Sequence, residues 1–251
     1  MEHLKNLFIS AKDNLGFLLV SIAIVAALAV AAHVVERFFP QKRKVSPAKR
    51  ISLIAMCSAV AAVLHILDFP LPFLAPGFYK LDFSELPVLL CSFYLGPSAG
   101  VACEAVKILL KLLLKGTTTA FVGDFANFVV GCSLVLPAAV CYHLRKTRKT
   151  AIWGLVAGTA VMTVFGSLFN AVYLLPKFAE LYGMPLETIV AMGTDINGHI
   201  TSVSTLVLFA VVPFNILKGC VVSVLTFLLY KRVETVLFRS VRPKSQPQPQ
   251  H

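Results

Sequence analysis

The sequence has little charge for its length. Only 14% of its 251 residues are charged and 57% are hydrophobic, whereas about 25% and 45–50% are usual in a soluble domain. The mean hydropathy is +0.81. This composition excludes a disordered chain, a collagen and a secreted disulfide scaffold, and it indicates a protein that resides in a lipid bilayer.

Acidic residues are scarcer than basic ones. The chain has 12 Asp and Glu against 23 Lys and Arg, which gives a formal net charge of +11. In a soluble protein this excess would suggest a nucleic-acid partner, but in an apolar chain it more often reports membrane topology. We therefore expect a lipid bilayer and no nucleic acid.

Catalytic and metal-binding patterns are also missing. No pair of the six cysteines has C-x-x-C spacing, and there is no Gly-rich phosphate loop of the G-x-x-x-x-G-K-[ST] type. The histidines within apolar segments, His33 and His65, have no companions. We expect no catalytic residue, no bound metal and no cofactor.

Apolar segments of about 20 residues predict membrane-spanning helices, because a helix satisfies its own backbone hydrogen bonds in hydrocarbon. A longer apolar segment, Leu86–Leu114, is divided by Gly96-Pro97 into two helices joined by a tight hairpin. The prediction is seven spans. The other five are Leu15–Val35, Ile51–Leu67, Phe121–Tyr142, Ala151–Leu175 and Ser202–Tyr230.

The distribution of Lys and Arg predicts the orientation. Fifteen of them lie in segments 36–50, 143–150 and the tail after Tyr230, whereas the opposite segments hold five. Because cytoplasmic loops are rich in Lys and Arg, we expect the N-terminus outside and the C-terminus in the cytoplasm of a multi-pass plasma-membrane protein.

Charges inside the predicted spans are few and therefore informative. Glu104 and Lys107 share a helix face with Lys111, which favours an internal ion pair with Lys111 extending outward to the surface, although ligand contact is an alternative. Asp124 lies in the first turn of its helix, where a carboxylate complements the helix dipole.

Amides within the spans need hydrogen-bond partners. For Asn127, contact with another helix and contact with a ligand are equally good explanations, and Asn170 could likewise bond a neighbouring helix. Asn215 and Lys218 share a face midway along the last span, after Pro213. Since Lys218 has no acid near it in its own helix, we favour a functional role for it.

The predicted outer loop 68–84 is rich in proline and aromatic residues, so it could fold down as a lid. An aromatic lid above a few amides and one amine describes a pocket for a flat, largely neutral, hydrogen-bonding molecule.

Six fragments, in register from residue 50 to residue 232, resemble the riboflavin-specific substrate-binding subunit, or S component, of energy-coupling factor (ECF) transporters. These fragments are Tyr79–Pro87, Leu95–Pro97, Gly123–Phe128, Gly183–Glu187, Ala191–Gly193 and Pro213–Gly219. Two departures stand out. The family often has Glu at the position of Asp124, and the stretch 194–199 is divergent.

The resemblance implies an all-α, six-helix membrane bundle that does no chemistry, captures riboflavin from outside and delivers it to the cytoplasm. Its implied partners are a membrane scaffold subunit and two cytoplasmic ATPases. By resemblance, Asn215, Lys218, Asn170 and Asn127 contact the ligand, and the lid contributes Tyr79, Lys80, Asp82 and Phe83. The Ala-x-x-x-Ala spacing of Ala55 and Ala59 would serve the scaffold contact.

Three segments are expected. Residues 1–49 form an extra transmembrane helix and a basic linker, residues 50–232 form the six-helix domain, and residues 233–251 form a flexible cytoplasmic tail.

The main alternative function is a stand-alone secondary transporter for a flavin or another small vitamin, although no internal repeat supports it. An intramembrane enzyme is a third reading, but no catalytic constellation lies at matching depth.

Overall fold

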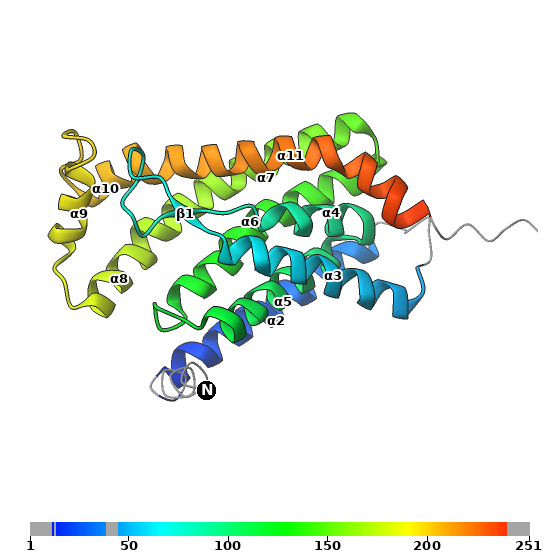
Figure 1. Cartoon of the computed structure of the whole chain (residues 1–251), viewed down its shortest axis with the longest axis horizontal. Helices are drawn as coiled ribbons and strands as arrows, with labels where there is room; N and C mark the ends of the chain where they lie inside the picture. The colour runs from blue at the N-terminus through cyan, green and yellow to red at the C-terminus, as the bar shows by residue number, and fades with distance from the viewer. Residues whose placement is uncertain (1–11, 13, 39–44, 240–251) are drawn as a thin grey trace, which may run out of the picture.

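The computed structural model describes residues 12, 14–38 and 45–239. Within these ranges the regular secondary structure is helical except for one short hairpin, β1 (Phe69–Pro70) with β2 (Lys80–Leu81), and loops connect the elements (Figure 1). The helices are α2 (Leu15–Arg37), α3 (Pro47–Ile66), α4 (Glu85–Leu95), α5 (Pro97–Lys115), α6 (Val122–Arg145), α7 (Arg148–Phe169), α8 (Leu175–Tyr182), α9 (Leu186–Thr194), α10 (Val203–Leu206) and α11 (Val212–Arg239).

Two π-helical turns lie within longer helices. The turn η1 (Asn170–Leu174) joins α7 to α8, and η2 (Val207–Val211) joins α10 to α11 one turn before Pro213. A π turn shifts the register of a helix and is frequent at functional sites. The η1 turn leads into α8 and the η2 turn follows α10, and Figure 1 shows α8 and α10 on the same side of the bundle as β1.

The all-α membrane fold predicted from the sequence is confirmed. Among the described residues, five helical stretches are long and apolar enough to cross a bilayer: Leu15–Arg37, Pro47–Ile66, Val122–Arg145, Arg148–Tyr182 and Val203–Val233. The two remaining predicted spans are the short apolar α4 and the charge-bearing α5. The body is thus six helices, with α2 as a seventh.

The predicted break at Gly96-Pro97 is also present. Helix α4 ends at Leu95 and α5 begins at Pro97, with Gly96 between them at φ 111°. This left-handed backbone favours glycine, because a Cβ would clash there. Proline at the first helical position needs no N–H, so the pair reverses the chain within one residue.

Helices α6 and α7 approach closely through two glycines of α7. A Cβ at Gly154 would lie 2.6 Å from the carbonyl oxygen of Ala138, and one at Gly158 would press on that of Leu134. The Gly-x-x-x-Gly spacing places both on one helix face, as in many membrane helix pairs.

The extra helix α2 packs on α5 and α6. Its buried residues Ser21 and Ala32 face the body, and Ala32 joins an apolar cluster with Ile108 and Phe128. At one end Glu36 accepts a hydrogen bond from the Ser98 amide in the first turn of α5 (3.3 Å). Because this carboxylate complements the N-terminus of α5, α2 is held to the body at that end.

The expected start of the tail, at residue 233, is too early. Helix α11 continues to Arg239, so residues 233–239 extend it rather than begin a flexible tail. The predicted span ended before Lys231 and Arg232 because these residues are charged. Apolar residues nevertheless follow them, namely Val233, Val236 and Leu237. Residues 240–251 lie outside the described residues.

Candidate substrate-binding site

The predicted lid is built on the β1–β2 hairpin, in which Phe69 pairs with Leu81 and Pro70 with Lys80. The buried Tyr79 fixes the loop to the helices. Its hydroxyl donates to Asn170 Oδ1 at 2.8 Å, and its ring centroid lies 5.8 Å from that of Phe214. The loop 68–84 is therefore packed on the bundle rather than extended into solvent.

Beneath this loop lies a cavity of about 360 Å³. A cavity of this size is within the roughly 300–1,000 Å³ typical of small-molecule sites. Its wall comes from the lid, the ends of α3 and α5, the first two turns of α6, the η1–α8 region and α11. These segments are far apart in the sequence, so the cavity exists only in the folded bundle.

Most of the site residues predicted from the sequence line this cavity. They are Tyr79, Lys80, Asp82, Asn127, Asn170, Asn215 and Lys218. Phe83 does not. Its ring packs against Phe69 of the hairpin, with centroids 6.2 Å apart. The assignment of Phe83 to the ligand site stays a prediction that the cavity wall does not support.

The three amides differ in how they are held. The Nδ2 atoms of Asn127 and Asn170 donate to the carbonyl oxygens of Gly123 (3.0 Å) and Gly166 (2.7 Å). Asn215 is only 6% exposed, and its Nδ2 has no hydrogen-bond partner among the described residues. A buried, unpaired amide costs free energy, so Asn215 presents a donor that a ligand acceptor can satisfy.

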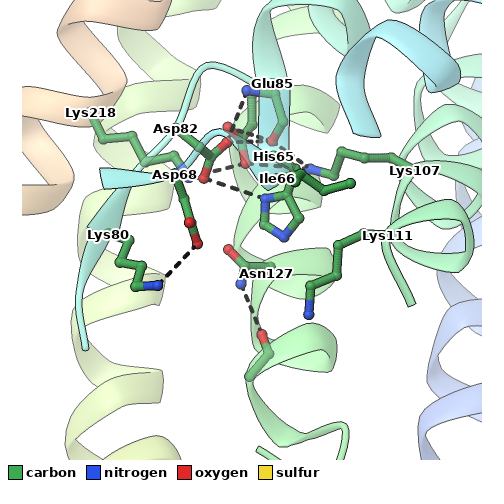
Figure 2. A network of polar contacts seen from close by, with 12 residues as sticks. His65, Ile66, Asp68, Lys80, Asp82, Glu85, Lys107, Lys111, Asn127 and Lys218 are labelled. Atoms are coloured by element: carbon green, nitrogen blue, oxygen red, sulfur yellow. Dashed lines mark hydrogen bonds and ion pairs between the residues drawn. The ribbon is translucent and has the colours of Figure 1, made fainter. Parts of the chain in front are cut away.

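Lys218, which has no acid nearby in its own helix, meets two carboxylates from elsewhere. Its Nζ lies 3.0 Å from Asp82 Oδ2 and 3.2 Å from Glu85 Oε1. Figure 2 shows Lys218 and Lys107 on opposite sides of these carboxylates. Lys107 lies 3.5 Å from Glu85 Oε1, so Glu85 is shared by two lysines.

The expected ion pair within α5 is confirmed. Glu104 Oε2 and Lys107 Nζ are 2.5 Å apart, and both side chains are fully buried. Gly131 of α6 makes room for them, since a Cβ there would collide with the Glu104 carboxylate. Lys107 also donates to Ser84 Oγ at 3.1 Å, which links this pair to the lid.

Asp82 is buried beside basic groups. Burial alone would raise the pKa of the Asp82 carboxyl, but the charge of Lys218 and a contact with His65 together hold that pKa well below its usual range. His65 Nδ1 lies 3.5 Å from Asp82 Oδ2. Ser84 donates to Asp82 through its hydroxyl (2.5 Å) and its amide (2.9 Å). The lid thus ends in an anchored carboxylate.

The expectation that Lys111 extends outward is wrong. Its Nζ turns back to Asp124 Oδ1 (2.5 Å) and to the carbonyl oxygen of Gly116 (3.0 Å), and the side chain is 15% exposed. The buried carboxylate on the neighbouring helix offers a stronger partner than the surface. Asp124 therefore pairs with a lysine besides lying in the first turn of α6.

Sequence reasoning missed several cavity residues. The rings of Phe78, Phe178 and Phe214 line the cavity with Tyr79, and Phe78 and Phe178 meet edge to face at 5.8 Å. An isolated aromatic residue in an apolar helix carries no signal for a site. His65 lines the cavity as well, and its lone position gave no hint of Asp82.

The cavity wall is suited to binding a small molecule. Among the described residues, no three His, Cys, Asp or Glu side chains are grouped as metal ligands would be. The wall offers aromatic faces, amides and paired charges.

A family model described as "ECF transporter, substrate-specific component" matches residues 49–230. The chain belongs to this family. As an S component it is the substrate-binding part of a transporter, which supports a role other than catalysis.

Two similar proteins are named riboflavin transporters. RibU of Staphylococcus aureus (strain TCH60) is 39% identical over 191 residues, which cover 76% of this S component and 93% of RibU. FmnP of Bacillus subtilis (strain 168) is 32% identical over 187 residues, which cover 74% of this S component and 92% of FmnP.

A solved structure is also similar. It is described as "Structure and mechanism of the S component of a bacterial ECF transporter". The TM-score is 0.60 and the sequence identity is 40%, and the match covers 77% of this chain and 100% of the chain in that structure.

Proposed function

We propose that this S component captures riboflavin from outside the cell and delivers it to the cytoplasm. The observation that carries the proposal is a cavity of about 360 Å³ with aromatic and amide walls in a chain 39% identical to a protein named riboflavin transporter. Riboflavin is flat, uncharged and rich in hydrogen-bonding groups, so it suits aromatic faces and amides.

The residues that line the cavity are assigned the following contacts with riboflavin. Asn215 donates from its unpartnered Nδ2 to a ring acceptor, and Asn127 and Asn170 present their amides to the ring or the ribityl chain. Lys218 is a further polar contact from α11, held in place by Asp82. Tyr79 and Lys80 belong to the lid that covers the ligand.

Release into the cytoplasm requires energy that this chain does not supply. We propose a membrane scaffold subunit and two cytoplasmic ATPases as partners, which is what the resemblance to ECF S components implies, and the membership in this family supports the proposal. Ala55 and Ala59 are exposed on α3, one turn apart, where their small side chains let another helix approach closely. Their exposure supports α3 as the scaffold contact.

The orientation and the division of the chain are part of the same proposal. The N-terminus lies outside and the C-terminus in the cytoplasm, which accords with the Lys and Arg count. Residues 50–232 are the riboflavin-binding domain, and residues 1–49 add the seventh helix and its linker.

The test uses the purified full chain in detergent. We expect a yellow protein from which mass spectrometry identifies extracted riboflavin, and riboflavin binding without ATP. Asn215→Ala should weaken binding at least tenfold, whereas Ser52→Ala, a change on the exposed face of α3, should not. A colourless protein that binds riboflavin weakly would refute the proposal, and uptake by this chain alone in vesicles would favour a stand-alone transporter.

A further inference from the structure

Every lysine of the cavity wall is paired with an aspartate of the same wall. The pairs are Lys80 with Asp68 (3.6 Å), Lys111 with Asp124 (2.5 Å) and Lys218 with Asp82 (3.0 Å). Asp68 is shared with Lys115, whose Nζ lies 3.0 Å from Oδ1. Among the described residues, every lysine of the wall therefore has a carboxylate within 4 Å. An anionic ligand needs a cation without such a carboxylate, because burying its charge without a partner is costly.

The pair of Lys111 and Asp124 lies at the positive end of the α6 dipole, where Thr119 already accepts hydrogen bonds from the amides of Val122 and Gly123. The N-terminus of a long helix attracts anions through its dipole, and α6 runs for 24 residues from Val122. Lys111 reaches the same corner from α5, and Thr118 and Thr119 line it. The Asp124 carboxylate occupies this corner as a built-in anion, so a second negative charge there would be repelled.

The two carboxylate oxygens of Asp124 differ in their hydrogen-bond partners. Oδ1 contacts Lys111 Nζ, whereas Oδ2 is buried and has no hydrogen-bond partner among the described residues. The whole residue is only 3% exposed and lines the cavity. A buried carboxylate oxygen without a donor is costly. A ligand hydroxyl can donate to it, but a phosphate dianion has no proton to donate.

The aromatic part of the wall lies on other elements. Tyr79 belongs to the lid, Phe178 to α8 and Phe214 to α11, and the Tyr79 and Phe214 rings are 5.8 Å apart. One flavin can therefore place its ring against these aromatics and direct its hydroxyl chain to the corner built by α5 and α6. That chain carries the phosphate in flavin mononucleotide.

We propose that Asp124 makes this S component select an uncharged flavin over its phosphate ester, by accepting a hydrogen bond from a ligand hydroxyl and by keeping Lys111 paired. The inference rests on the proposed function and names the selectivity of the same site. Its structural basis is the corner of Lys111, Asp124 and the first turn of α6.

The test measures riboflavin and flavin mononucleotide in parallel titrations of the full chain, purified and freed of ligand. The quantity compared is the ratio of the two dissociation constants, ester over riboflavin. We expect at least a tenfold ratio in the native chain. Asp124→Asn should reduce this ratio at least tenfold, because Lys111 becomes free to bind phosphate. Added salt should weaken the binding of the phosphate ester to this variant and so raise the ratio again.

Three further variants identify the cause. Adding Lys111→Met to Asp124→Asn should restore the ratio, and Lys111→Met alone should widen it because Asp124 is then unopposed. The single Lys111 variant also keeps the test decisive if Asp124→Asn does not fold. Glu180→Gln is the matched control. It removes a carboxylate from an exposed ion pair with Lys177 outside the cavity wall, and the ratio should stay unchanged.

The outcomes separate this inference from the proposed function. A native chain that binds neither flavin refutes the proposed function. A native chain that binds both equally, or an Asp124→Asn variant that binds riboflavin with an unchanged ratio, overturns the selectivity role of Asp124 and leaves the proposed function standing.

Discussion

Replacing Lys218 with methionine should destabilise the bundle strongly. Met keeps most of the side-chain volume but leaves Asp82 and Glu85 without the ammonium now 3.0 and 3.2 Å away. Both acids are nearly fully buried. Breaking a buried ion pair by removing one partner costs about 3–5 kcal/mol. Lys107 still lies 3.5 Å from Glu85, so we expect the lower part of this range.

The assay is thermal unfolding of the full chain in detergent. For a chain of this size about 1 kcal/mol shifts the Tm by roughly 2–4 °C, so Lys218→Met should lower it by roughly 6–12 °C. Asp82→Asn in the same chain removes one of the two orphaned charges. The double variant should therefore lose less unfolding free energy than the two single variants lose in sum, by about 1 kcal/mol or more.

The control is Lys177→Met, which breaks the exposed pair with Glu180 on α8. This change should leave the Tm almost unaltered, because exposed pairs contribute little. Additive effects of Lys218→Met and Asp82→Asn would contradict the buried ion pair, since they would mean that the two charges do not interact in the folded protein.

Three further predictions concern packing, the seventh helix and pH. Gly158→Val should destabilise the α6–α7 pair and lower the Tm, because its side chain would press on the Leu134 carbonyl, whereas Ala160→Val on the lipid-facing side of α7 should not. Glu36→Gln should weaken the link to Ser98 and increase protease cleavage between α2 and α3, measured by limited proteolysis; an unchanged cleavage rate would count against that link. The pKa of Asp82 is held below its unfolded value of about 4, so the Tm difference between the native chain and Asp82→Asn should be constant from pH 8 to 5 and shrink as the pH falls below about 4. A difference that shrinks above pH 5 would contradict this assignment.

The helices were predictable because their signals are local. Hydrophobic length marked the spans, and Gly96-Pro97 marked the hairpin, since both depend on neighbouring residues alone. The end of α11 was misplaced because Lys231 and Arg232 interrupt hydropathy without interrupting the helix.

The partners of the buried charges were not predictable in the same way. Lys218 was correctly expected to need an anion, but Asp82 is 136 residues away in the sequence. Lys111 was misassigned because its partner lies on the next helix, after a loop whose course the sequence does not specify. Only the packing of α5 against α6 brings these two side chains together.

The most direct test of the account is calorimetric titration of riboflavin into the ligand-free full chain without ATP, beside the Asn215→Ala variant. If the cavity is a riboflavin site, the dissociation constant should be below about 1 μM, equivalent to roughly −8 kcal/mol, and the variant should bind at least tenfold more weakly. A dissociation constant well above 1 μM, or equal affinities of the two proteins, would contradict this assignment of the cavity.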